Sequence, residues 1–130
     1  MRRIALAFAS IALLAASPAL ANCPASATLD GKFKANDQGS YQLRSNGTTV
    51  WWIGKSADGG ASWTNVFKGT RKGDIIIGQW ADVGDGASGS GTLSLKVTAN
   101  NQLVKLAGGD FGGSIWLRPG CSYSKATAID

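Results

Sequence analysis

Short segments of alternating apolar and polar residues, separated by turn residues, are the feature that most restricts how this chain can fold. In the segment Thr92–Thr98, apolar residues occupy every second position and polar residues lie between them. A period of two is typical of β-strands that bury one face. Pairs such as Asn46-Gly47 and Asp85-Gly86 favour tight turns, because glycine and asparagine accept positive φ angles. No apolar pattern of helical period extends past two turns, so the sequence predicts an all-β fold.

The alternation and the turns predict about eight strands joined by short hairpins. The predicted strands are Thr28–Lys34, Ser40–Arg44, Thr48–Lys55, Ser62–Thr70, Asp74–Asp82, Gly91–Thr98, Gln102–Ala107 and Ser114–Arg118. Connections this short cannot form the crossovers that parallel strands need, so we expect an antiparallel up-and-down meander. Eight such strands can close into a small barrel whose interior holds side chains or one small ligand. An OB-like barrel and an open sandwich are the alternatives.

The first residues have the composition of an export signal. Two arginines follow Met1, an apolar run covers Ile4–Ala16, and residues 19–21 (Ala-Leu-Ala) match the small-residue pattern that a signal peptidase recognises. The sequence therefore predicts a signal peptide over residues 1–21 and a single mature domain over residues 22–130. The apolar run is shorter than the roughly 20 residues that span a bilayer. We expect a periplasmic or extracellular protein that does not span a membrane.

Two cysteines lie near opposite ends of the expected domain, at Cys23 and Cys121. In an oxidising compartment this pair predicts a disulfide. A disulfide requires Cα atoms within about 7 Å of each other, so the first and last segments of the domain should be neighbours, as in a closed barrel. Lipid attachment at Cys23 is the alternative, because residues 20–23 resemble a bacterial lipobox, although Asn22 replaces the usual small residue.

The composition excludes most common catalytic and metal chemistry. The chain contains no histidine, and all eight of its acidic residues are aspartates. Imidazole bases, histidine metal cages and glutamate acids are therefore absent. Asp82 and Asp85 could offer oxygens to Ca²⁺, but a calcium loop needs more ligands at defined spacing. We expect no metal, no cofactor and no enzymatic activity, with a weak aspartate-dependent hydrolase as the third functional hypothesis.

The positive charge of the chain is modest. The net charge of +5 falls to +3 without the two arginines of the predicted leader, because 11 basic and 8 acidic residues remain. The basic residues are spread along the chain, and only Arg71 and Lys72 are adjacent in the mature part. A nucleic-acid interface normally concentrates positive charge on one stripe. We therefore expect no nucleic-acid partner and interpret the cations as a solvated surface.

Tryptophans on several predicted strands supply candidate binding residues. Trp51 and Trp52 are consecutive, so they point to opposite faces of a strand and only one can face the barrel interior. We predict that Trp52, Trp80 and Trp116 form the walls of a ligand pocket, which the bulk of the rings restricts to one mouth of the barrel. The alternative is that these rings fill the core.

Three polar residues follow a tryptophan by two positions and therefore share its strand face: Asn65, Asp82 and Arg118. We interpret them as polar anchors for a ligand; alternatively, Asp82 bonds the next turn and pairs with Arg118. The leading hypothesis is a secreted, non-enzymatic barrel that binds a small molecule or a glycan at one mouth. The second is a protein-interaction or inhibitor module of the cell envelope that uses exposed Trp51 and a loop beginning at Asp58.

Several motifs between Gly47 and Arg118 resemble a small exported bacterial module, rich in tryptophan and glycine, of unassigned activity. They are Val50–Gly54, Asp58–Gly60, Trp63–Thr70, the WADV-containing segment Gly78–Val83, Gly89–Leu93 and Phe111–Trp116. This resemblance implies common ancestry with that module, but it assigns no catalytic or binding role to any residue of this chain. In outline, a short, tryptophan-rich meander of eight strands also resembles avidin and streptavidin, or a shortened lipocalin. That outline carries no biotin-binding motif with it, and a shared fold does not imply a shared activity.

Overall fold

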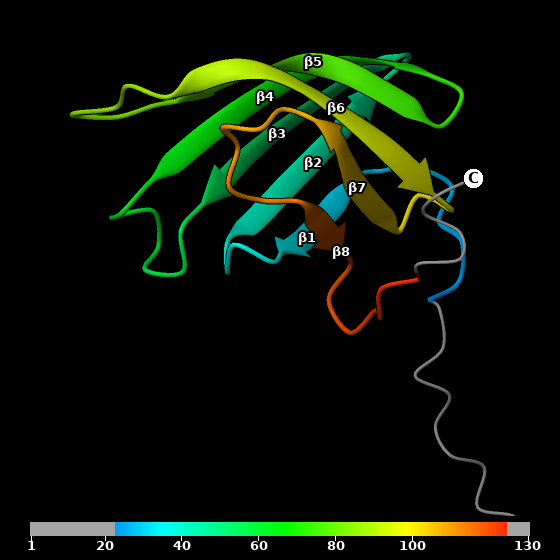
Figure 1. Ribbon diagram of the computed structural model, residues 1–130. Helices are drawn as coiled ribbons and strands as arrows, with labels where there is room; N and C mark the ends of the chain where they lie inside the picture. The colour runs from blue at the N-terminus through cyan, green and yellow to red at the C-terminus, as the bar shows by residue number, and fades with distance from the viewer. Residues whose placement is uncertain (1–22, 125–130) are drawn as a thin grey trace, which may run out of the picture.

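The computed structural model describes residues 23–124, which form a closed barrel of antiparallel strands (Figure 1). The strands are β1 (Gly31–Ala35), β2 (Ser40–Asn46), β3 (Thr49–Lys55), β4 (Thr64–Lys72), β5 (Ile75–Asp82), β6 (Ser90–Thr98), β7 (Gln102–Ala107) and β8 (Ile115–Leu117). Each strand pairs with the next one in the chain, and β8 closes the barrel on β1. The predicted eight-stranded meander barrel is confirmed. The predicted leader, residues 1–21, lies outside the described residues.

The observed strands differ from the predicted ones by a few residues, mostly where side chains bind the backbone of a turn. β1 begins later than predicted, because the hydroxyl of Thr28 accepts a hydrogen bond from the amide of Asp30. β4 begins after Ser62, whose amide donates to the carboxylate of Asp58 within the preceding loop. β8 stops before Arg118, whose side chain binds carbonyl groups of other segments. The described range holds no helical segment that could cross a bilayer.

The connections between the strands give the barrel two different ends, because successive strands run in opposite directions. The loop end carries the longer connections, residues 36–39, 56–63, 83–89 and 108–114. The disulfide end carries the tight turns 47–48, 73–74 and 99–101. The first and last described segments, residues 23–30 and 118–124, also lie at the disulfide end, where they are neighbours (Figure 1).

The disulfide end is closed by the predicted bond between Cys23 and Cys121, whose Cα atoms lie 5.4 Å apart. Both sulfurs belong to this bond, so Cys23 has no thiol for lipid attachment. The side-chain amide of Asn101 donates to the carbonyl of Cys23 at 2.8 Å and so fixes the first segment against the turn between β6 and β7. A disulfide indicates an oxidising, non-cytoplasmic environment.

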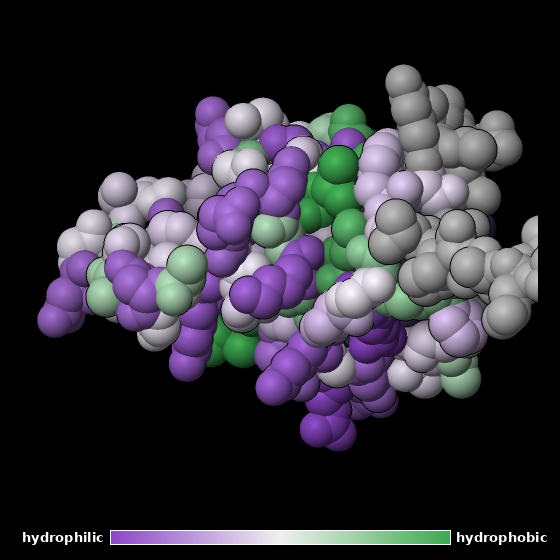
Figure 2. Space-filling model, turned by 90° about the horizontal axis from the view of Figure 1, so that it is seen from below, coloured by the Kyte–Doolittle hydropathy of each residue, from purple (hydrophilic) through white to green (hydrophobic). Residues whose placement is uncertain are grey.

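Inward and outward positions alternate along most strands, as the sequence pattern predicts, but not along β7, where Gln102 and Leu103 are both buried. In β3, Val50, Trp52 and Gly54 are buried, whereas Trp51 and Ile53 are exposed. Viewed from below the barrel (Figure 2), hydrophilic side chains cover much of the surface around a smaller apolar strip. The alternation therefore separates an apolar interior from an outer face that is mostly polar.

Candidate functional site

The three tryptophans predicted to form pocket walls lie in the core instead. Trp52 is 3% exposed and Trp116 is fully buried. The ring of Trp52 lies 4.4 Å from that of Phe67 and 5.4 Å from that of Trp116, measured between centroids. Trp80 is also buried, and the centroid of its ring lies 5.0 Å from that of Phe111. The interior of an eight-stranded barrel is just wide enough for side chains or one small ligand, and here these rings occupy that width. Trp52 and Trp80 also border the depression described below, but at 3% and 7% exposure they offer a ligand little surface, so the alternative of a filled core describes the three rings better.

Asn65 and Asp82 lie together near the loop end, as the sequence indicated. They occupy facing positions of β4 and β5. Asn65 is buried, and its side-chain oxygen accepts a hydrogen bond from the indole nitrogen of Trp52 at 2.9 Å. Asp82 borders a cleft of about 360 Å³ between loops 56–63 and 83–89. The hydrogen bond with Asn65 orients the Trp52 ring in the core. The side-chain oxygen of Asn65 is therefore used inside the protein and is not directed at a ligand.

A second buried polar group lies beside Asn65. The hydroxyl of Tyr41 donates to the carboxylate of Asp37 at 2.5 Å, and that carboxylate also accepts the amide of Gly39 at 2.8 Å. Burial, and then the bond to Asp37, raise the pKa of Tyr41 far above its usual value. A side chain at Gly54 would collide with both Tyr41 and Asn65, so glycine is required there. The protonated phenol therefore supports the fold and is not a general base.

Arg118 lies at the disulfide end, away from Asn65 and Asp82. β5 and β8 run in opposite directions, so the residues that follow them lie at opposite ends of the barrel. The guanidinium of Arg118 donates to the carbonyls of Asp30, Thr28 and Asn100 at 2.5, 2.8 and 3.1 Å. The prediction of one shared site, and the alternative pairing of Arg118 with Asp82, are therefore wrong.

Replacing Arg118 with methionine is expected to lower the free energy of unfolding by about 1–2 kcal/mol, because carbonyls at the disulfide end lose charged donors. The guanidinium also covers the ring of Phe33 at 4.3 Å, a contact that methionine only partly replaces. Urea unfolding followed by circular dichroism measures the loss. Arg44→Met is the control, since Arg44 is exposed on β2, and it should change stability by less than about 0.5 kcal/mol. Equal losses in the two variants would contradict this role of Arg118.

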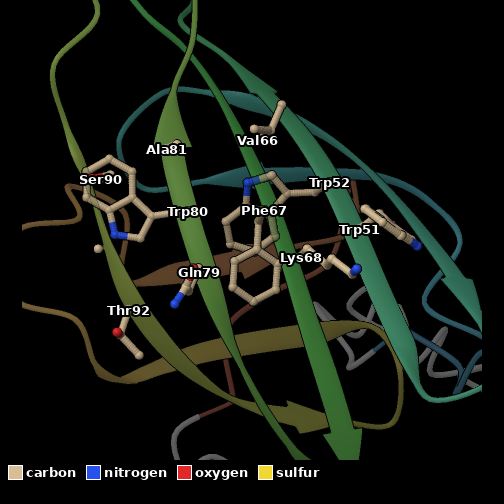
Figure 3. A pocket seen from close by; sticks show the side chains of 11 residues that line it. Trp51, Trp52, Val66, Phe67, Lys68, Gln79, Trp80, Ala81, Ser90 and Thr92 are labelled. Atoms are coloured by element: carbon tan, nitrogen blue, oxygen red, sulfur yellow. The ribbon is translucent and has the colours of Figure 1, made fainter.

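Trp51 is the most exposed of the five tryptophans, all of which are described. Its side chain is 45% exposed, and it points away from the cluster formed by Trp52, Phe67 and Trp80 (Figure 3). Its cross-strand neighbours are Arg44 on β2 and Lys68 on β4. The ammonium of Lys68 lies 4.7 Å from the centroid of the Trp51 ring, within the range of a cation–π interaction. Trp51 is therefore held on the outer face between two cations.

A depression of about 670 Å³ lies beside Trp51 on the outer face of β3–β6 (Figure 3). Its outward lining residues, besides Trp51, are Val66, Lys68, Gln79, Ala81, Ser90 and Thr92. Trp51, Lys68, Gln79 and Thr92 form one row across four paired strands, so an ammonium, an amide and a hydroxyl lie in line with an aromatic ring. Such sites combine apolar contact with a few polar groups that orient a ligand. We take this depression, with Trp51 at its edge, as the candidate functional site.

Asp58 does not join Trp51 in a common surface. It lies in loop 56–63, beyond the end of β3, and accepts hydrogen bonds from the hydroxyls of Ser56 and Ser62. The bonds from Ser56 and then Ser62 hold the pKa of Asp58 well below its usual range. Its carboxylate therefore organises its own loop, and the predicted pairing of Trp51 with Asp58 is not observed.

Sequence reasoning missed a gathering of cations on the outer face of β1–β4. The exposed basic residues at outward positions near Trp51 are Lys32, Lys34, Arg44, Lys55 and Lys68. They are separated along the chain but lie on neighbouring strands. The signal was present in the alternation, because each of them occupies a polar position of a predicted strand. Basic residues that are scattered along the sequence can still cluster on the folded surface, so their spacing in the sequence did not reveal this cluster.

Comparisons with known proteins give no match: no family model, no curated protein and no solved structure is similar enough to report. Among residues 23–124, no three acidic, cysteine or histidine side chains come together as ligands for a metal ion. The fold and the site thus define a class, a small closed β-barrel with an aromatic and cationic outer face. The resemblance to an exported bacterial module stays a prediction.

Proposed function

We propose that this protein is an exported, non-enzymatic binding module that holds a glycan against the outer face of its barrel. The observation that carries the proposal is Trp51, an exposed ring at the edge of a preformed depression and beside Lys68. An aromatic ring can stack against the apolar face of one sugar, and the amide of Gln79 and the hydroxyl of Thr92, two and three strands away in the same row, can bond hydroxyl groups of the sugars that follow it.

The rigidity of the outer face favours it over the barrel mouth as the binding site. Binding loses less free energy to ordering when the site is already formed, and the depression is built on four hydrogen-bonded strands. A ligand among the interior rings would have to displace Trp52 or Trp80 from the packed core. The proposed ligand is therefore a glycan on the surface rather than a small molecule inside the barrel.

A protein partner is the second candidate, since the apolar surface continues beyond Trp51. Ile53 and Val66, which face each other on β3 and β4, are both exposed. Neighbouring exposed apolar side chains are typical of protein interaction surfaces. In that case replacing Ile53 and Val66 together with serine would abolish binding to the partner, whereas a glycan that depends on Trp51 would still bind.

Trp51→Ala is expected to weaken glycan binding about tenfold or more, because the stacking ring is lost. The free energy of unfolding should fall by about 1 kcal/mol at most, since the side chain is half exposed. Isothermal titration calorimetry with a panel of neutral and acidic polysaccharides measures the affinity.

The matched control for Trp51→Ala is Ile77→Ala. Ile77 is exposed on β5, but it does not line the depression, so its replacement should leave affinity unchanged. If no polysaccharide of the panel binds, or if Trp51→Ala binds as well as the unmodified protein, the proposed function is wrong.

A further inference from the structure

Three of the five cations on the outer face of β1–β4 border a groove on the outer face of β1–β3. This groove has a volume of about 360 Å³, and Lys32, Lys34 and Lys55 are among its lining residues. Lys34 and Lys55 occupy one row of the sheet, on either side of Ser40. Since neighbouring strands lie about 4.8 Å apart, the backbones of these two lysines are about 10 Å apart. Two ammonium groups can therefore reach into the groove from opposite sides.

The groove and the depression lie on opposite sides of β3. Ile53 lines the groove, and Trp51, two residues away on the same outward face, lines the depression. Their strand neighbours, Gln42 beside Ile53 and Arg44 beside Trp51, are exposed polar residues. The two hollows therefore lie side by side on one surface, which a single extended ligand can cover.

The charges of this surface are not neutralised by the protein itself. No aspartate occupies an outward position of β1–β4. The ion pair found within residues 23–124 joins Arg71 to Asp74, in the turn between β4 and β5. Asp30 stands at the edge of the surface, before β1, and its carboxylate accepts the amide of Ser45 at 2.5 Å. An anionic ligand is therefore the complement of this face.

Most aspartates of the described range lie instead at the loop end of the barrel. They are Asp37, Asp58, Asp82, Asp85 and Asp110. Lys34 and Lys55 border that end, beside the loops that carry Asp37 and Asp58, whereas Lys32, Arg44 and Lys68 lie farther along the strands. The acidic loops therefore confine a polyanion to the strands of the lysine face, because like charges beyond the loop end repel it.

We infer that the glycan is acidic: a polyuronate whose sugar ring stacks on Trp51 while carboxylates of neighbouring sugars bind Lys32, Lys34 and Lys55. This inference rests on the proposed function and names its substrate class. Lysine ammonium groups form strong, charge-assisted hydrogen bonds with carboxylates. Single-stranded nucleic acid normally stacks successive bases on several aromatic rings, whereas the outward positions of β1–β4 offer one, Trp51. A polyuronate therefore matches this surface better than a nucleic acid does.

The test compares polygalacturonate and alginate with their methyl esters, which keep the sugar rings and remove the charge. Calorimetry at low ionic strength should show each acid binding about tenfold or more tighter than its ester. Added NaCl should weaken binding of the acids and leave that of the esters unchanged, because salt screens exposed charges.

Lys34→Gln combined with Lys55→Gln is expected to weaken binding of the acids about tenfold without affecting the esters. The matched control is Lys72→Gln combined with Lys96→Gln. It removes the same charge from strand positions that do not line the groove, and should change affinity by less than about threefold.

The outcomes separate the inference from the proposed function. Equal binding of acids and esters, with loss in Trp51→Ala, overturns the acidic substrate and leaves glycan binding intact. Absence of binding by either form, across the whole panel, overturns the proposed function and this inference with it. If oligodeoxythymidylate or vesicles of anionic phospholipid bind as tightly as the polyuronates, and lose affinity equally in the double lysine variant, the surface is a general polyanion site and the inference is wrong.

Discussion

Replacing Trp52 with alanine is expected to lower the free energy of unfolding by about 3–5 kcal/mol. The Trp52 ring is packed against Phe67 and Trp116, so its removal opens a cavity in the centre of the barrel. The substitution also removes the donor that satisfies the buried carbonyl oxygen of Asn65, and an unsatisfied buried acceptor adds to the loss. Urea unfolding followed by far-ultraviolet circular dichroism measures the change without relying on tryptophan emission.

The neighbouring position supplies the control for this prediction. Trp51 has the same side chain one residue earlier in β3, but it lies on the outer face. Trp51→Ala should therefore lower the free energy of unfolding by about 1 kcal/mol at most and weaken glycan binding, whereas Trp52→Ala should lower the free energy of unfolding by about 3–5 kcal/mol. Comparable stability losses in the two variants would show that the assignment of inward and outward positions in β3 is wrong.

Removing the disulfide by Cys23→Ala combined with Cys121→Ala is expected to lower the free energy of unfolding by about 4 kcal/mol. The two cysteines are 98 residues apart in the sequence. In the chain-entropy model, a bond that closes a loop of this length restricts the unfolded chain by up to about 4.7 kcal/mol. The folded protein keeps other contacts at this end, among them the bonds of Asn101 and Arg118. The variant should therefore still fold, with reduced stability.

Thermal and urea unfolding of the oxidised protein, the double variant and the reduced protein together measure this effect. The reduced protein should match the double variant, because both lack the same covalent constraint. Intact-protein mass spectrometry with a thiol-alkylating reagent should detect no free thiol before reduction. Two free thiols in the native protein, or equal stability with and without the bond, would contradict the closure of the barrel by Cys23 and Cys121.

The architecture was predictable because its determinants are local. Alternation in segments such as Thr92–Thr98 specifies which face of a strand is buried, and short turns restrict the topology to a meander. The cysteine pair then favours a barrel whose first and last segments are neighbours. Strand ends were less accurate, because side chains such as those of Thr28 and Asp58 bind turn backbone in ways that a hydrophobic pattern does not show.

The site was harder to predict, because it depends on relations between strands. Arg118 and Asp82 both follow a tryptophan by two positions, but opposite strand directions place them at opposite ends of the barrel. Lys34 and Lys55 are distant in sequence, but each is the cross-strand partner of Ser40, so the two lysines lie in one row of the sheet. Composition and spacing carry no information about such a row until the pairing register is known.

The most direct test of the account is nuclear magnetic resonance of the five indole N–H signals during titration with polygalacturonate. The outer-face site predicts that the signal of Trp51 shifts progressively, while the signals of Trp52 and Trp116 stay in place, because the Trp52 indole nitrogen is bonded to buried Asn65 and that of Trp116 is buried. Trp51→Ala identifies its signal by deletion. Shifts of the core signals with an unmoved Trp51 would place the ligand inside the barrel and contradict the account.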